Sequence, residues 1–276
     1  VQTCALPISN GIIYLDMMFD VDSLSEYVPQ MSFLATLLGY MDTTEHTYRE
    51  FDTETNFYSG GIGSDLNIYS IYDTDAVNLK FTVRTKTLAG RIKDTTKLMA
   101  EMMFKTLFTD EKHLREVVAE TRSRLKVRLM SAGHQAAVSY SMAGLTLDGW
   151  YNDYSMGIGY YDYLVKLDEN FDSEKEKLIK GCEELVKAMF KKKKMLISCT
   201  CDENDYGLLC GAISEFDSEL ENFEKENSAD ILELESYKPD VKCRKTAFST
   251  PAEVQYAAVS GSYKDVPDVN DGAMMV

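Results

Sequence analysis

The residues best suited to chemistry in this chain are its three histidines, His46, His113 and His134. Zinc sites on helices commonly use two histidines four residues apart, because that spacing places both rings on one face. None of the three has such a partner, and the sequence contains no cluster of His, Glu and Cys ligands. The sequence therefore predicts no metal site and no catalytic residue. We expect the chain alone to bind no zinc and to hydrolyse no peptide.

The cysteine pair Cys199-x-Cys201 is a second candidate. Both thiols lie in the apolar run 195–201, where strand alternation places them on one face. Zinc sites usually bring C-x₂-C pairs or histidines, and none accompanies this pair. We expect buried, reduced thiols, with metal binding or redox use as the alternative. Reduced thiols are typical of a reducing compartment such as the cytoplasm.

Four residues are candidates for substrate binding: Gly60, Gly61, Tyr160 and Tyr161. Two adjacent glycines permit positive φ and close backbone approach, so the pair serves either the turn into a strand or contact with a peptide. The tyrosines between Tyr151 and Tyr163 are unusually dense. Aromatic rings with polar tips suit surfaces that hold extended peptides, although packing in the core explains them as well.

Two further groups have simpler interpretations. His134, at an expected helix start, is interpreted as a structural histidine that hydrogen-bonds neighbouring backbone. The basic residues of 122–128 occupy alternate positions that spread around a helix, which is typical of a solvated face.

Composition bounds the class of protein. The chain has 276 residues, 45% of them hydrophobic and 27% charged, which is ordinary for a globular protein. A net charge of −16 argues against nucleic acid as a partner, because phosphate binding needs clustered Lys and Arg. No apolar run approaches the roughly 20 residues that cross a bilayer, so no membrane partner is expected.

Hydrophobic periodicity predicts strands followed by a run of helices. We expect strands at 11–21, 62–72, 78–85 and 195–201, and helices at 24–38, 47–55, 91–108, 110–130, 135–147, 173–190 and 204–223. Ser173 and Glu176 have the spacing of a capping box at the start of one helix. This order of elements favours an α+β layer structure.

Four short motifs occur in an order that resembles a known family. They are Asn10–Asp22 (NGIIYLDMMFDVD), Tyr58–Ile62 (YSGGI), Ser131–His134 (SAGH) and Met156–Tyr161 (MGIGYY). Together they resemble the second half of the pitrilysin/insulinase zinc metallopeptidases, specifically the associated region of the presequence-protease branch. The resemblance implies a LuxS/metallopeptidase-like fold, in which a mixed or antiparallel sheet covered by long helices forms half of an inverted-zinc metallopeptidase.

The resemblance also implies a division of labour. In the intact enzymes zinc is held by H-x-x-E-H in the first half, which this chain lacks. The implied partners are the N-terminal catalytic half of the same polypeptide and unfolded peptide substrates. This chain would then contribute chamber wall and substrate grip. The alternative is a non-catalytic structural or binding protein that shares the fold.

The ends and composition shifts suggest how the chain is divided. Residues 1–8 resemble a translated sequencing adapter and are interpreted as an artefact. Residues 9–225 are expected to form the associated α+β domain and 226–249 an acidic linker. The range 250–276, with a strand at Val254–Ser260, is expected to be the truncated start of a C-terminal α+β domain.

Overall fold

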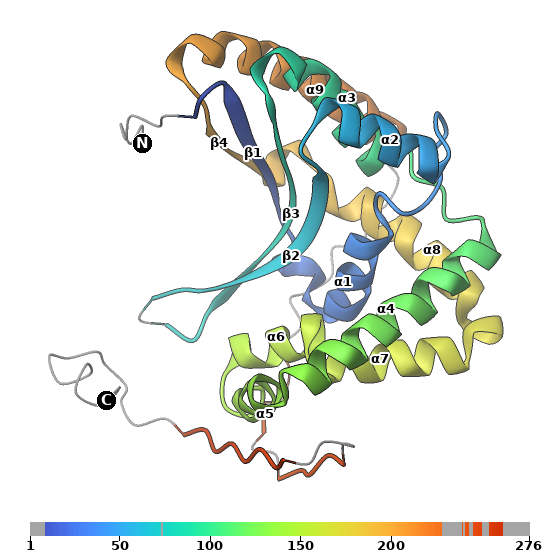
Figure 1. Cartoon of the computed structure of the whole chain (residues 1–276), viewed down its shortest axis with the longest axis vertical. Helices are drawn as coiled ribbons and strands as arrows, with labels where there is room; N and C mark the ends of the chain where they lie inside the picture. The colour runs from blue at the N-terminus through green and yellow to red at the C-terminus, as the bar shows by residue number, and fades with distance from the viewer. Residues whose placement is uncertain are drawn as a thin grey trace, which may run out of the picture.

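The fold is a curved four-stranded sheet with its helices on one side (Figure 1). The computed structural model describes residues 9–72, 74–227, 239, 241–242, 245–249 and 254–261. The strands are β1 (Ile12–Asp20), β2 (Ile62–Ser70), β3 (Val77–Leu88) and β4 (Met195–Thr200), and their order in the sheet is β2-β3-β1-β4. All neighbouring pairs are antiparallel. The predicted α+β class is confirmed, and the described sheet is antiparallel, not mixed.

Strand alternation decides which face of the sheet is covered. In β1 the residues Ile13, Leu15, Met17 and Phe19 are fully buried beneath the helices. The residues between them point to the opposite face, where Tyr14 remains 46% exposed. Because successive side chains of a strand point to opposite faces, one face of the sheet is packed and the other is left open.

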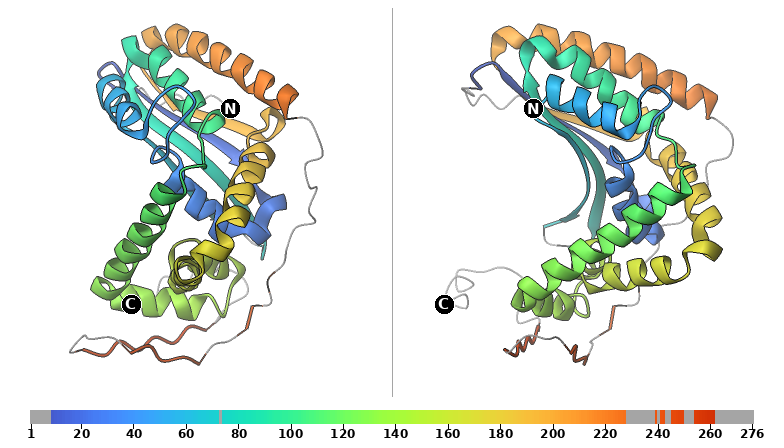
Figure 2. Two further views of the ribbon diagram at one scale, coloured as in Figure 1. Left: turned by 90° about the vertical axis from the view of Figure 1, so that its right-hand side faces the viewer. Right: turned by 45° about the vertical axis from the view of Figure 1, so that its right-hand side comes forward.

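The helices gather in two groups (Figure 2). In one group α3 and α9 lie side by side along the covered face of the sheet, with α2 beside them. In the other group α4 to α7 lie near the far end of β2. The bounds are α1 (Val28–Leu37), α2 (Tyr48–Tyr58), α3 (Ile92–Phe104), α4 (Glu111–Ser131), α5 (Gly133–Met142), α6 (Leu147–Met156), α7 (Ile158–Glu169), α8 (Phe171–Met189) and α9 (Tyr206–Glu226). None of the described helices is both long and apolar enough to span a membrane.

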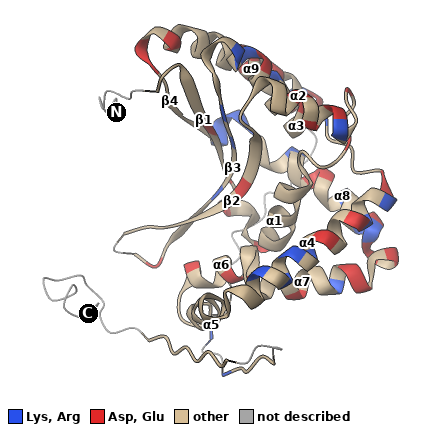
Figure 3. Ribbon diagram, viewed as in Figure 1, with Lys and Arg blue, Asp and Glu red and all other residues tan. Residues whose placement is uncertain are grey.

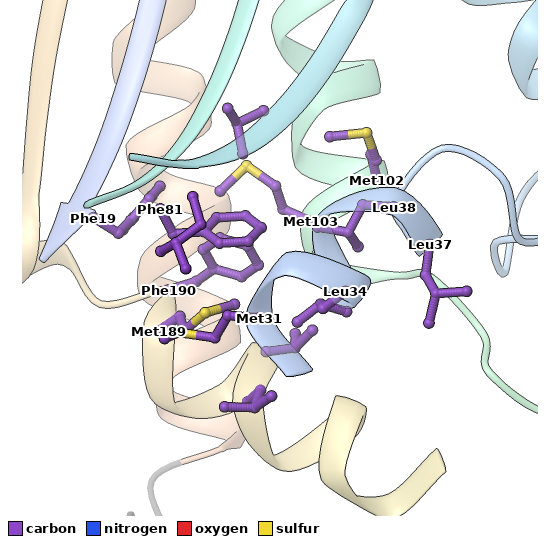
Figure 4. Close-up of a cluster of buried hydrophobic side chains, with 14 of the residues drawn as sticks. Phe19, Met31, Leu34, Leu37, Leu38, Phe81, Met102, Met103, Met189 and Phe190 are labelled. Atoms are coloured by element: carbon purple, nitrogen blue, oxygen red, sulfur yellow. The ribbon is translucent and has the colours of Figure 1, made fainter. Parts of the chain in front are cut away.

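The core between sheet and helices centres on Phe190, which directly follows α8 (Figure 4). Its ring is fully buried and meets Phe19 and Phe81 edge to face, with centroids 5.0 and 5.8 Å apart. Met31 and Leu34 of α1 extend the same cluster. Aromatic rings in this geometry stabilise a core beyond the area that they bury.

Three helix predictions need correction. The helix expected at 135–147 ends at Met142, and α6 and α7 were not predicted. The capping box at Ser173 is wrong, because α8 already begins at Phe171 and the Ser173 hydroxyl donates to the Asn170 carbonyl. The expected helix at 24–38 starts with a 3-10 turn, Asp22–Tyr27, before α1 begins.

The strand predicted at Val254–Ser260 is also wrong. Residues 254–261 have no regular structure and follow α5 instead of pairing with another strand. The Tyr256 ring lies 6.0 Å from that of His134, and the Ser260 and Ser141 hydroxyls are hydrogen-bonded. A strand needs a neighbour that supplies the hydrogen-bond ladder. Residues 1–8 and most of 226–249 lie outside the described residues, so the division into domains stays a prediction.

Candidate functional site

Two hollows flank strand β2, one on each side of the sheet. The sheet-face hollow, about 580 Å³, lies on the open face and is lined by residues 14, 16, 60–63, 84–86 and 198–200. The helix-side hollow, about 310 Å³, is enclosed by α1, β2, α4, α6 and α7. The two share no lining residue, since β2 contributes Ile62 and Gly63 to the first and Ser64 to Leu66 to the second.

Gly60 and Gly61 form one wall of the sheet-face hollow. Gly61 has φ of +110°, a conformation that side chains disfavour, and its carbonyl accepts from the Thr85 hydroxyl at 2.9 Å. The Gly60 amide donates to the Lys86 carbonyl at 2.7 Å. The pair therefore makes the turn into β2, and it also lines the hollow. The two roles considered from the sequence are compatible.

Charges on the open face are paired with one another. Arg84 Nε lies 3.7 Å from Asp65 Oδ2 and 4.0 Å from Asp16 Oδ1. Lys80 Nζ lies 2.6 Å from Asp20 Oδ2. Beside these pairs, Tyr14 and Leu196 are 46% and 58% exposed. The face thus offers apolar contact and local polar partners without a strong field of either sign.

The tyrosine candidates are not on the open face. Tyr160 is only 6% exposed and lines the helix-side hollow, whereas Tyr161 is half-buried against the core and lines neither hollow. Burial raises the pKa of Tyr160, while the nearby Thr36 and the positive charge of Arg128 oppose the rise. Among the two explanations considered from the sequence, packing therefore accounts for these two tyrosines better than an exposed peptide grip.

The basic stretch of α4 is more than a solvated face (Figure 3). Arg122 pairs with Asp168 of α7 at 2.6 Å, while Lys126 is exposed. Arg124 and Arg128 both line the helix-side hollow. Their separation by four residues, which puts them on one face of the helix, was the signal available in the sequence.

His46 is isolated in sequence but not in space. Its Nδ1–H donates to the buried Glu101 of α3, at 2.9 Å to Oε1 and 3.1 Å to Oε2. The Thr43 hydroxyl donates to the same Oε1 at 2.5 Å. Glu101 thereby fixes the loop between α1 and α2 to α3. This contact joins residues 55 positions apart, and no local pattern predicts it.

Glu45, His46 and Glu101 place three ligand atoms within 4.8 Å of one another. These atoms are already engaged, because Lys105 Nζ lies 2.6 Å from Glu45 Oε1 and Glu101 accepts from Thr43 and His46. The hydrogen bond to Glu101 also raises the pKa of His46, which favours the protonated ring that cannot ligate a metal. The arrangement is therefore better suited to anchoring the loop than to holding a cation.

The raised pKa of His46 predicts a pH-dependent contribution to stability. A pKa raised above the unfolded value of about 6.5 stabilises the fold fully below that pH. The contribution is lost as pH rises through the folded pKa. The unfolding free energy of the native chain should therefore exceed that of His46→Gln by more at about pH 6 than at about pH 8.5. Urea denaturation measures both, and His134→Gln, far from Glu101, is the control. A margin that stays constant or grows with pH would contradict the prediction.

The remaining candidates have structural surroundings. His113 Nε2 bonds the Tyr40 carbonyl at 2.7 Å and its ring stacks on Tyr48. The expectation of buried thiols is wrong for the cysteine pair, because Cys199 is exposed and Cys201 is half-buried. β4 is an edge strand of the described sheet, so its side chains are covered less than those of β1. Both thiols are free, and burial is the main cause that raises the pKa of each.

Comparison with known proteins finds a family and several larger relatives. The family described as "Peptidase M-16C associated" matches residues 1–167. Presequence protease 1, chloroplastic/mitochondrial, from Arabidopsis thaliana is 25% identical over 269 residues, which are 97% of this chain and 24% of that protein. Protein HypA from Clostridium perfringens is 23% identical over 258 residues, 93% of this chain and 26% of that protein. This chain therefore spans about a quarter of the length of these relatives.

The likeness extends to a solved structure. A conserved protein from Enterococcus faecalis V583 superposes with a TM-score of 0.51 at 8% identity, over 75% of this chain and 47% of that one. Such low identity supports a shared fold and nothing further. The match over residues 1–167 and the presequence proteases confirm the resemblance identified from the motifs. This chain belongs to the matched peptidase-associated family, a non-catalytic region of larger peptidases.

Proposed function

We propose that this chain forms a wall of a zinc metalloendopeptidase that degrades unfolded oligopeptides, and that its sheet-face hollow holds an extended segment of the substrate. One observation carries the proposal: the sheet is packed on one face only, and its open face contains a hollow bordered by glycines and exposed apolar side chains. An extended peptide presents backbone amides and alternating side chains, and such a surface can accept both.

The described residues do not fit a catalytic zinc site. Each histidine is engaged by a neighbour, namely Glu101 for His46, the Tyr40 carbonyl for His113 and the Tyr256 ring for His134. No two of these side chains are brought together within the described residues. The proposal accordingly assigns zinc to another part of the larger protein. The partner is then the N-terminal catalytic half of the same polypeptide.

This assignment explains why one face of the sheet is left uncovered. In the proposed enzyme the chain is half of an inverted-zinc metallopeptidase with a LuxS/metallopeptidase-like fold, and its open face is turned to the catalytic half. Peptide enters between the two halves as an unfolded chain. The paired charges of the open face favour no net charge of substrate, so recognition rests on shape and apolar contact.

Peptide binding at the sheet-face hollow can be tested by filling it. A Cβ at Gly63 meets no atom within 4 Å, so Gly63→Phe places a ring in the hollow without disturbing the backbone. Fluorescence anisotropy with a labelled, unfolded peptide of about 20 residues should show at least a tenfold loss of affinity, equivalent to about 1.4 kcal/mol. Gly207→Phe, at an equally open position on α9, is the matched control.

Equal affinities for the native chain and Gly63→Phe would refute the role of this hollow. Zinc added to the chain alone should produce no cleavage of the peptide. Cleavage is expected when the chain is joined to the catalytic half, and Gly63→Phe should then raise KM more than it lowers kcat. Peptide binding without cleavage by the joined protein would favour the alternative, a structural or binding protein.

A further inference from the structure

The helix-side hollow combines positive charge with buried hydroxyl groups. α1 contributes Ser32 and Thr36, α4 contributes Arg124 and Arg128, and α7 contributes Tyr160. Its volume of about 310 Å³ exceeds the share of liquid occupied by one water, about 30 Å³, several-fold. A small ligand group therefore fits where these three helices meet.

The charge in this hollow is not neutralised locally. Arg124 pairs with Glu120 one turn earlier on α4. Arg128 donates to the Met156 carbonyl, and among the described residues no acidic group lies within ion-pair distance of it. The one acidic residue in the lining, Asp65, pairs with Arg84 on the other side of β2. A guanidinium group with spare donors binds carboxylate or phosphate oxygens in preference to other groups.

Two hydroxyl groups of the lining lack partners. Tyr160 Oη and Ser32 Oγ are buried and form no hydrogen bond in the structure. Most buried polar groups in folded proteins are hydrogen-bonded, so each orphan needs an explanation. Arg128 is close enough to influence the Tyr160 hydroxyl electrostatically. Two arginines and two unsatisfied donors thus converge on the same hollow, and an acceptor with several oxygens would satisfy them.

We propose that the helix-side hollow is an oxyanion site, in which Arg124 and Arg128 bind a carboxylate or phosphate group and the Tyr160 hydroxyl donates to one of its oxygens. The site would accept either a phosphate ion or the C-terminal carboxylate of a peptide. It is separated from the sheet-face hollow by β2 and does not depend on the function proposed above.

Isothermal titration calorimetry of the full chain at low salt tests the site. One probe is inorganic phosphate, and the others are an N-acetylated tetrapeptide with a free carboxylate and the same peptide as its amide. The double variant Arg124→Gln/Arg128→Gln should lose at least about tenfold in affinity for the bound probe, because charged hydrogen bonds are lost. Lys126→Gln, which removes the same charge from an exposed position on α4, should change it little.

Tyr160→Phe provides a variant that keeps the buried ring. It should weaken binding several-fold while leaving the melting temperature of the free chain unchanged, since the hydroxyl has no partner to lose. Binding of phosphate alone, or of the free peptide but not its amide, supports the site and identifies the source of the oxyanion. Absence of binding by every probe would overturn the proposal. An equal loss in Lys126→Gln would do the same, because it would indicate unspecific attraction.

Discussion

Replacement of Phe190 by alanine is expected to cost about 4 kcal/mol of unfolding free energy. The ring is fully buried and forms edge contacts with Phe19, Phe81 and Phe104, so one truncation removes contacts to β1, β3 and α3 together. Truncation of a buried aromatic loses the transfer free energy of the ring and leaves a cavity that the surrounding sheet and helices fill only partly. Urea denaturation followed by circular dichroism measures the loss.

Phe57→Ala is the matched control for this truncation. Phe57 is 65% exposed, although Arg91 stacks on its ring at 4.9 Å. The expected cost is therefore below about 1 kcal/mol. Similar losses in the two variants would mean that Phe190 does not lie at the centre of the core.

A methyl group at Gly149 should destabilise the chain by about 2 kcal/mol. A Cβ at this position would lie 2.5 Å from the Met142 carbonyl oxygen and 2.7 Å from its carbon. That carbonyl cannot easily move, because it accepts from the amides of Leu145 and Thr146 in the turn between α5 and α6. Thermal and urea unfolding of Gly149→Ala should both show the loss.

The same change should have the opposite effect at Gly181. This glycine lies inside α8, and a Cβ there meets no atom within 4 Å. Alanine is favoured over glycine in a helix interior by about 0.5–1 kcal/mol, so Gly181→Ala should stabilise the chain. If both variants changed stability in the same direction, the close approach of α5 and α6 at Gly149 would be wrong.

The strands were predictable because apolar alternation is a local signal. All four lie within a few residues of their expected positions, but β3 continues to Leu88 beyond the predicted end at Thr85. The extension depends on β1, since Leu88 pairs with Ile12. The helices α6 and α7 were missed because the buried positions are partly filled by tyrosines such as Tyr151 and Tyr160, which weaken an apolar stripe.

The site was predictable only where it depends on neighbouring residues. The two glycines at the start of β2 were identified because adjacent glycines indicate special backbone conformation wherever they occur. The contact of His46 with Glu101 depends on the packing of a loop against α3. The convergence of Arg124, Arg128 and Tyr160 likewise requires the packing of α4 beside α7, which no spacing in the sequence contains.

The strand order has a consequence for synthesis of the chain on the ribosome. β1 lies between β3 and β4, and Phe19 of β1 pairs with Met195, which is translated 176 residues later. At 5–20 residues per second this delay lasts roughly 10 to 35 s. During that time β1 can pair with β3 but keeps a bare edge, which invites pairing with other chains. The nascent chain must therefore survive this interval with an incomplete sheet, and the arrival of β4 closes it.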